Sequence, residues 1–473
     1  MNPTTNFKQI TLQDKQYFYS FLSDNQIIEI KSEQKPYAKD ETEDLEFYPD
    51  LVLIAKTTLE VSQVAKYCNE QQLPLTVRGA GTGLSGGALP VCGGVVLSLE
   101  KMNQVVDFDE ENFQITVETG IINEELRQIV EAKGLFYPPD PASKGSCTIG
   151  GNIAFNSGGP KALKYGVTSH YILNLEVVLA DGSIVWTGAN TLKNSTGYNL
   201  TQLVVGSEGT LAIATKAVLK LIPKPKHQVL LLASFTDSEW ACRKVSEIFH
   251  LGITPSAIEF LERDAIEWTL NFLDLDADRL KPETQAQLLI ELEGNELEHL
   301  QEEAERVAEL LDENVCNELF FADNAREKDQ LWEIRRKVGE AVKSNSIYKE
   351  EDTVVPRSKL PALLKKVKQL GHTYGFRSVC YGHAGDGNLH INIVKEDLSD
   401  KQWNEELPQA IRQLFEFVCS IGGTISGEHG IGLVQKNYMD IAFNPKAIDI
   451  QRQIKNCLDP KGILNPKKMF PDS

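Results

Sequence analysis

Apolar residues recur along the first half of the chain in two rhythms, short unbroken runs and a helical spacing. The run Leu51–Ala55 predicts a buried strand. From Thr58 to Asn69, apolar side chains return every three or four residues behind the N-cap candidate Thr57, which predicts a helix. The short run Leu75–Val77 follows, so the segment predicts a strand–helix–strand unit.

More strands are predicted after this unit. Val95–Leu99 and Phe113–Val117 have the apolar content of strands. Leu173–Leu179 is followed by the turn pair Asp181-Gly182 and by Ile184–Trp186. Two apolar runs around such a turn predict a β-hairpin.

The pattern changes after the Pro-Lys-Pro-Lys stretch at 223–226, where we place a domain boundary. Beyond it, the apolar runs Val229–Ala233, Gln287–Leu292 and Leu319–Ala322 alternate with helical spacing. One helix is marked between Leu297 and Leu311, where apolar residues line one face and glutamates the other. This part of the chain predicts an α+β domain with about two βαβ-like units.

Four segments follow from these signals. Residues 1–45 are a polar lead-in with helical signals around Asp14–Leu22, and residues 46–225 form the first domain. Residues 226–415 form the second domain, and the mainly helical segment 416–473 is expected to return to the first. A chain of 473 residues is long for a single core, which agrees with this division.

Charge and composition narrow the class of protein. The net charge of −19 would repel nucleic acid, so nucleic-acid binding is excluded as the main function. The charge-free stretch from Gly79 to Leu99 contains seven glycines and Pro90 and is rejected as a transmembrane helix. No signal peptide is visible, and the eight cysteines form no CxxC pair, which favours a reducing compartment. We expect a cytoplasmic protein, with peripheral attachment at the inner membrane left open.

Glycine is concentrated in two blocks of the first domain. One reads RGAGTGLSGG from Arg78, directly after a predicted strand, and the other reads KGSCTIGGN from Lys144. Glycine lets successive backbone N–H groups approach a phosphate closely. The first block lacks the spacing of GxGxxG and no Walker lysine follows, so a Rossmann NAD site and a P-loop are disfavoured. Two such loops favour a ligand with a pyrophosphate and two ends.

Four blocks in order, RGAGTGLSGG, PPDPASKGSCTIGGNIAFNSGG, NSTGYNL and GSEGTLAI, resemble the FAD-binding domain of the vanillyl-alcohol-oxidase superfamily. The chain is most similar to the branch of D-lactate dehydrogenases, the glycolate oxidase catalytic subunit and D-2-hydroxyglutarate dehydrogenase. The resemblance implies an α+β fold. It consists of a two-subdomain FAD-binding domain of the PCMH type, an α+β ferredoxin-like cap domain and a helical C-terminal segment.

The resemblance also implies which residues hold FAD. The first loop would wrap the pyrophosphate, the second would lie along the ribityl chain and flavin, and the remaining residues would contact the flavin or close over the cofactor. These residues are Arg78, Gly79, Ala80, Gly81, Thr82, Gly83, Leu84, Ser85, Lys144, Gly145, Ser146, Thr148, Ile149, Gly150, Asn152, Asn156, Gly209, Ile213 and Asn465. Relatives with a covalent flavin carry a histidine near Thr82 or a cysteine near Ser146, so we expect non-covalent FAD, although Cys147 is adjacent.

The strongest chemical signal lies in the second half of the chain. The segment YGHAGDGNLHIN places His383 and His390 on either side of a glycine-rich turn, and Glu428 and His429 follow in the segment SGEHG. Two histidines and one carboxylate are the ligand set of a catalytic divalent-metal site. Zn²⁺ is favoured, and Mn²⁺ and Fe²⁺ remain alternatives. Glu428 and His429 can face one site only if their segment is a turn, because adjacent strand residues point to opposite faces.

The family pattern assigns roles to these residues. It implies that His383, His390 and Glu428 bind the metal and that His429 is the base. A metal would lower the pKa of the substrate hydroxyl, His429 would take its proton, and the C2 hydride would pass to flavin N5. Arg335, in a matching WxxR motif, would bind the substrate carboxylate, and Asn392 would hydrogen-bond the substrate.

The substrate expected on this basis is D-lactate or glycolate. The 2-hydroxyglutarate branch has a lysine clamp where an ungapped match from Pro356 places Glu350, and Lys349 is one residue away. D-2-hydroxyglutarate dehydrogenase is therefore the first alternative. A flavin-dependent transferase like alkyl-dihydroxyacetone-phosphate synthase and a non-catalytic subunit are the others. The electron acceptor (quinone, cytochrome or electron-transfer flavoprotein) and a homodimer are left open.

Overall fold

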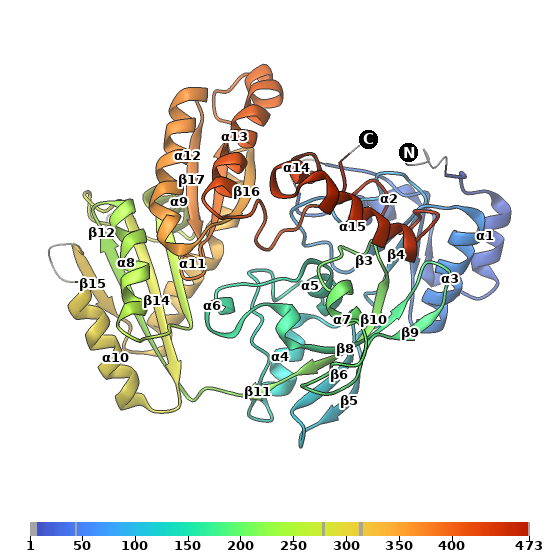
Figure 1. Cartoon of the computed structure of the whole chain (residues 1–473), viewed down its shortest axis with the longest axis horizontal. Helices are drawn as coiled ribbons and strands as arrows, with labels where there is room; N and C mark the ends of the chain where they lie inside the picture. The colour runs from blue at the N-terminus through green and yellow to red at the C-terminus, as the bar shows by residue number, and fades with distance from the viewer. Residues whose placement is uncertain (1–6, 43–44, 277–279, 312–315, 472–473) are drawn as a thin grey trace. The chain divides into compact units, whose positions relative to one another are not determined.

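A computed structural model describes residues 7–42, 45–276, 280–311 and 316–471. The chain forms two compact units (Figure 1). The first unit comprises residues 1–157, 167–224 and 428–473, and the second comprises residues 158–166 and 225–427. Each unit has its own sheets and core, and each is described separately below.

The first unit opens with a four-stranded sheet of order β1-β2-β4-β3. Helix α3 (Thr58–Gln71) connects β2 to β3, and Thr57 caps it by accepting a hydrogen bond from the backbone N–H of Glu60. Both β2 and β3 pair in parallel with β4, which confirms the strand–helix–strand prediction and places a later strand between the two. The strands are β1 (Ile27–Ile28), β2 (Leu51–Ile54), β3 (Leu75–Arg78) and β4 (Val95–Ser98).

A second sheet of the first unit is antiparallel, with the order β5-β6-β10-β8-β9. The predicted hairpin is confirmed, because β8 and β9 pair through Glu176 and Trp186. The strands are β5 (Val105–Asp109), β6 (Gln114–Glu118), β8 (Ile172–Val178), β9 (Ile184–Trp186) and β10 (Ile213–Lys220), and a small sheet joins β7 (Leu135–Phe136) to β11 (Ile222–Pro223). The helices are α1 (Leu12–Tyr19), α2 (Lys31–Gln34), α4 (Asn123–Glu131), α5 (Ile149–Phe155), α7 (Leu200–Val204), α14 (Met439–Ala442) and α15 (Pro445–Leu458).

Both ends of the described chain belong to the core of the first unit. Phe18 of the lead-in is completely buried and packs with Leu53 and Val64. Ile463 and Leu464 enter the same core from the C-terminal segment, and Leu464 bridges Leu75 of β3. The lead-in is thus part of a buried hydrophobic cluster, although its own sequence is mostly polar.

The second unit contains a seven-stranded antiparallel sheet of order β15-β12-β14-β13-β17-β18-β16. Its first four strands, with helices α8 (Ser238–His250) and α10 (Leu297–Leu310) as crossovers, have the interleaved order of a ferredoxin-like fold. The predicted βαβ-like units are present in split form, because β12 and β13 lie on either side of β14 instead of pairing directly. The strands are β12 (His227–Phe235), β13 (Ala257–Glu262), β14 (Ala286–Gly294), β15 (Glu318–Phe321), β16 (Tyr348–Val354), β17 (Arg377–Gly382) and β18 (Asn388–Val394).

Helices cover both faces of this sheet. Helices α9 and α11 pack on the face that carries Leu261, Val379 and Tyr381, whereas α8 and α12 lie over the opposite face with Glu262 and Ser378. The helices are α6 (Ala162–Tyr165), α8 (Ser238–His250), α9 (Arg263–Phe272), α10 (Leu297–Leu310), α11 (Ala325–Asn345), α12 (Leu360–Tyr374) and α13 (Leu407–Ser420). Helix α10 buries Leu300, Ala304 and Val307 as its sequence predicts, but Leu297 is exposed.

The chain passes between the units at four places. One lies between Lys224 and Pro225, next to the expected boundary, and another lies between Gly427 and Glu428, later than the expected residue 416. The short segment 158–166 also belongs to the second unit, where Lys161 contacts Glu291 and Glu293 of β14 at 2.9 and 2.5 Å. No sequence signal predicted that residues 158–166 belong to the second unit.

Among the described residues, no helix combines the length and the apolar content that a membrane span requires.

Candidate functional site

The two glycine blocks of the first unit lie against each other. A Cβ atom built on Gly79 would stand 2.3 Å from the hydroxyl of Thr148, and one built on Gly87 would stand 2.5 Å from the ring of Phe155. Thr148 caps helix α5 and Phe155 ends it. The first glycine loop therefore packs directly on the helix that the second block forms, and any side chain at these positions would separate them.

Two buried polar atoms in the first of these loops have no hydrogen-bond partner in the described part of the chain. They are Arg78 Nη1 and Ser85 Oγ. Leaving such groups unpaired is costly, so each is best explained by a polar ligand. Gly145 and Gly209 have open space where a side chain would be, and Gly209 has a φ of +67°. Polar donors next to open backbone fit a large phosphate-bearing cofactor.

Other predicted cofactor residues have hydrogen-bond or ion-pair partners within the protein or are buried in its core. Asn156 ends α5 in the left-handed conformation and accepts the N–H of Ser169 at 2.8 Å. Lys144 is 3.1 Å from Asp140, and Ile213 is buried at the start of β10. Asn465 donates to the carbonyl oxygens of Gly87 and Glu208 at 3.0 and 2.7 Å. Asn465 thus holds the glycine loops in place from the C-terminal segment.

The remaining predicted cofactor residues lie in these same two loops. In the irregular segment after β3, Ala80 is exposed and residues 81–84 (Gly81, Thr82, Gly83 and Leu84) are partly exposed. Ser146 is exposed in the turn before α5, and Ile149 and Gly150 begin α5. Gly150 donates its N–H to the carbonyl of Thr119 at 2.7 Å.

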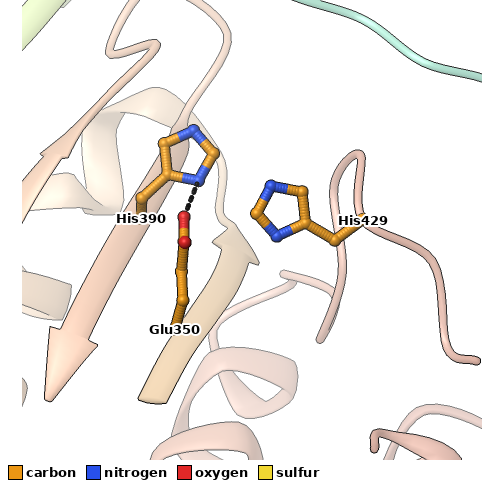
Figure 2. Close-up of side chains that lie close together, drawn as sticks. All are labelled: Glu350, His390 and His429. Carbon is orange, nitrogen blue, oxygen red and sulfur yellow. Dashed lines mark ion pairs between the residues drawn. The ribbon is translucent and has the colours of Figure 1, made fainter. Parts of the chain in front are cut away.

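The second unit places a set of polar side chains on one face of its sheet. The register aligns Asp352 of β16, His390 of β18 and Tyr381 of β17 as neighbours. Glu350 and Asn392 form the next row on the same face, because strand side chains alternate. Nδ1 of His390 is 3.2 Å from Glu350 and 3.7 Å from Asp352. Figure 2 shows the Glu350 carboxylate turned toward the ring of His390.

Glu259 of β13 is completely buried and connects two other predicted residues. Its carboxylate is 2.8 Å from Nδ1 of His383 and 2.6 Å from Nε of Arg335 on α11. Burial acts to raise the pKa of Glu259, but His383 and Arg335 hold that pKa below its usual value. Arg335 also stacks over the ring of Tyr381 at 5.2 Å, and its Nη2 is buried without a hydrogen-bond partner in the described residues.

The two histidines of the GHAGDGNLH segment are close together. Their rings have centroids 5.5 Å apart at 82°. Each ring places Nδ1 next to a carboxylate, which makes Nε2 the nitrogen that would bind a metal. Asn392 lies nearby, and its Oδ1 is buried without a partner in the part of the chain that the structure describes.

Glu428 and His429 lie in a bent segment outside any strand, as their proposed roles require. Gly430 follows with a φ of +75° and Gly432 with a φ of +48°. Glu428 and His429 are the first residues of the segment that belongs again to the first unit, and His429 is also drawn in Figure 2. The preceding residue, Gly427, belongs to the second unit and donates its N–H to Asp352 at 2.9 Å.

Four carboxylates close to these residues escaped prediction as site residues. Glu259 could have been noticed as a charge within the apolar strand AIEFLE, and Glu208 as a charge within GSEGT. Glu350 and Asp352 stand in the acidic segment KEED, which resembles an exposed surface. Only the pairing of β16 with β18 reveals that these two face His390.

Comparisons with known proteins agree with this architecture. The family model described as "FAD binding domain" matches residues 49–188, and the one described as "FAD linked oxidases, C-terminal domain" matches residues 224–469. The solved structure of p-cresol methylhydroxylase with substrate bound superposes with a TM-score of 0.80 over 98% of each chain, at 18% identity. The fold is therefore that of the PCMH-type flavoproteins.

Relatives define the family more narrowly. The glycolate oxidase subunit GlcD of Bacillus subtilis (strain 168) is 40% identical, with 92% of each chain covered. The D-lactate dehydrogenase of Anaerostipes hadrus is 37% identical, with 89% of each chain covered. The chain belongs to the FAD-linked oxidase family, in the branch that the four sequence blocks indicated, and it is an FAD-linked oxidoreductase.

The two glycine loops are the expected FAD-binding surface, called here the FAD cradle, and the Ser85 hydroxyl gives a test of it. Ser85→Ala should raise the dissociation constant of FAD about tenfold, because the cofactor would lose a buried hydrogen-bonding group. The apoprotein should be no less stable, since the hydroxyl has no described partner there. Titrating apoprotein with FAD and melting it without FAD measure the two effects.

Ser98→Ala is the matched control. Ser98 is also completely buried in the first unit, but its hydroxyl accepts the N–H of Glu100 at 3.4 Å. This variant should bind FAD like the wild type. Equal FAD affinity in both variants would remove Ser85 from the cradle.

Proposed function

We propose that the chain oxidises a small D-2-hydroxy acid, D-lactate or glycolate, to the 2-oxo acid. The observation that carries this proposal is Arg335. Its guanidinium is buried, shares the Glu259 carboxylate with His383, and has Nη2 without a hydrogen-bond partner among the described residues. A substrate carboxylate would supply that partner, since arginine binds carboxylates through two nitrogens.

We propose that His383, His390 and Glu428 hold a divalent metal, with Zn²⁺ favoured. The charges of the second unit support a cation there, because Glu259 lies beside His383 while Glu350 and Asp352 lie beside His390. Glu428 is covalently bonded to Gly427, whose N–H contacts Asp352, so its backbone begins at the edge of this group. A bound metal would act as a Lewis acid that lowers the pKa of the substrate hydroxyl.

In this proposal, Arg335, Asn392 and His429 each have a separate role. Arg335 fixes the substrate carboxylate, and Asn392 hydrogen-bonds the substrate through its buried amide oxygen. His429, next to Glu428, takes the hydroxyl proton, because histidine is the side chain that most often serves as a general base. FAD, when bound in the first unit, supplies the sink for the two electrons of the C2 hydride.

We propose that FAD is bound without a covalent link. Thr82 and Ser146, at the positions used for attachment elsewhere in the superfamily, are not residues that attach flavin. Cys147 is buried, and this burial raises the pKa of its thiol, so the reactive thiolate is disfavoured. The cysteine pattern continues to favour a cytoplasmic location, and quinone, cytochrome and electron-transfer flavoprotein remain candidates for the acceptor.

A monocarboxylate substrate is supported by the pleat of β16. Glu350 faces His390, whereas Lys349 points to the opposite face, where its Nζ reaches the carbonyl of Trp403 at 3.3 Å and lies over the Trp403 ring. The position of the second carboxylate clamp is thus occupied by an acid. A negative side chain there would repel the distal carboxylate of 2-hydroxyglutarate.

The substrate prediction is tested by anaerobic mixing with a panel of hydroxy acids. D-lactate or glycolate should bleach the oxidised flavin, and D-2-hydroxyglutarate should do so at least about a hundredfold more slowly because of the like charge at Glu350. Stopped-flow absorbance of the flavin is the measurement. Faster bleaching by 2-hydroxyglutarate would contradict the substrate class, and no bleaching by any hydroxy acid would favour the transferase or a non-catalytic subunit.

Arg335→Ala should weaken substrate binding strongly. Removing the charged partner of a buried carboxylate costs roughly 2–5 kcal/mol, and Glu259 would also lose one of its two partners. The Michaelis constant and the rate of flavin reduction are the readouts. Arg336→Ala is the control, because this neighbour lies on the exposed side of α11 over the Trp332 ring. Equal kinetics in the two variants would show that Arg335 does not bind substrate.

Substitutions should separate metal binding from proton removal. His383→Ala, His390→Ala and Glu428→Ala should each lose bound metal and activity but retain FAD, because none of the three is among the residues expected to hold the cofactor. His429→Ala should retain the metal and reduce flavin about 10²–10⁴-fold more slowly. Elemental analysis and flavin reduction rates measure both effects. Loss of metal from His429→Ala would show that His429 is a ligand.

A further inference from the structure

Glu208 is an unusual residue of the first unit. It is a charged side chain in the loop Gly206-Ser207-Glu208-Gly209, yet only 5% of it is exposed. Its φ of +53° lies in the left-handed region that residues other than glycine rarely adopt. Burial raises its pKa to about 7, against the opposing effect of two backbone hydrogen bonds. A residue kept in this conformation and environment is a candidate for a specific task.

The carboxylate of Glu208 is directed at the segment that follows His429. Its Oε1 accepts the N–H of Ile431 and its Oε2 accepts the N–H of Gly432, each at 2.7 Å. Two bonds to two separate oxygens fix the orientation of these peptide groups. We call residues 428–434 the His429 turn.

Two further contacts hold the His429 turn on the first unit. Leu433 donates its N–H to the carbonyl of Ser85 at 2.7 Å, within the first glycine loop. A Cβ atom on Gly430 would stand 2.7 Å from the Phe155 ring and 2.8 Å from Oε1 of Glu208. The turn is therefore packed closely against both glycine blocks.

The backbone of Glu208 is connected to the same cradle. Its N–H donates to the carbonyl of Ala154 on α5 at 2.8 Å, and its carbonyl accepts the Asn465 amide at 2.7 Å. Helix α5 carries Asn152 and Asn156, which belong to the predicted flavin contacts. One residue thus connects the cofactor helix, the C-terminal segment and the His429 turn.

We propose that Glu208 is a positioning residue that holds the His429 turn at a fixed place on the FAD cradle. This proposal rests on the proposed function only in the role given to His429. Because Glu208 acts through hydrogen bonds to peptide groups, its effect on catalysis passes through His429. Its side chain need not touch the substrate.

Glu208→Gln tests the proposal in the FAD-loaded enzyme. An amide has one acceptor oxygen, so one of the two N–H groups would face another donor. Hydrogen exchange of the amides in 428–434 should become about ten- to a hundredfold faster, because one of the two hydrogen bonds to Glu208 is lost. The turnover number with D-lactate should fall about tenfold or more, with the Michaelis constant changed less than about twofold.

The matched control is Glu176→Gln. Glu176 is another buried glutamate of the first unit, and its carboxylate is bonded to Thr58, Thr215 and Lys216 instead. Its substitution should leave exchange in the His429 turn and the turnover number unchanged. Equal effects of the two variants would show that Glu208 has only a general stabilising role.

A double-mutant cycle separates this proposal from the proposed function. If Glu208 acts through His429, adding Glu208→Gln to His429→Ala should slow flavin reduction no further. Additive losses would overturn the positioning role. Wild-type kinetics for His429→Ala would instead contradict the role of His429, while the exchange data would still decide whether Glu208 holds the turn.

The wild-type enzyme provides a test that needs no variant. The amides of Ile431 and Gly432 should be among the slowest to exchange within 428–434. Exchange of these two amides at the rate of an unprotected peptide would overturn the proposal even if Glu208→Gln fails to fold.

Discussion

The candidate site of the second unit depends on one buried carboxylate. Glu259 has no contact with solvent, and an ionised group so placed is tolerated only with charged or hydrogen-bonded partners. His383 and Arg335 are those partners, at 2.8 and 2.6 Å. The same pairing fixes which nitrogen of His383 faces Glu259 and directs the rest of the Arg335 guanidinium toward Tyr381. Removing Glu259 would release both groups at once.

The two units obtain their sites by opposite means. In the first unit, the absence of side chains at Gly79 and Gly87 lets two loops approach closely, and the buried Arg78 Nη1 and Ser85 Oγ have no hydrogen-bond partner among the described residues. In the second unit, side chains from β13, β16, β17 and β18 converge on one sheet face. A sheet with fixed register is rigid enough to hold several charged groups at set spacings. The glycine loops instead present backbone and small polar groups to a large ligand.

Local patterns explain why much of the fold was predictable from sequence. The strands near Leu51, Leu75 and Val95 and the helix capped by Thr57 depend on apolar spacing and capping within a few residues. The order of the strands did not follow from spacing, because β4 enters between β2 and β3 only through tertiary pairing. Family resemblance supplied the PCMH-type architecture that the local patterns could not.

The same distinction applies to the site residues. His383 and His390 were visible because they stand in one short glycine-rich segment. Glu259 was not, since it meets His383 across 124 residues of sequence, and Glu208 meets Ile431 across 223. A buried charge in an apolar run is the only local sign of such a pairing, and it does not identify the partner.

The acidic segment before Pro356 shows how strongly a site can depend on the pleat of a strand. Glu350 and Lys349 are adjacent in sequence, so a shift of one residue would exchange an acid for a base beside His390. Seven register pairs between β16 and β18, from Tyr348 to Val354, fix Glu350 opposite Asn392 and Asp352 opposite His390. A slip would also turn Asp352 away from Gly427, whose N–H it accepts at 2.9 Å, and would expose Tyr348 of the hydrophobic core. The packing of the sheet therefore determines the sign of the charge next to His390.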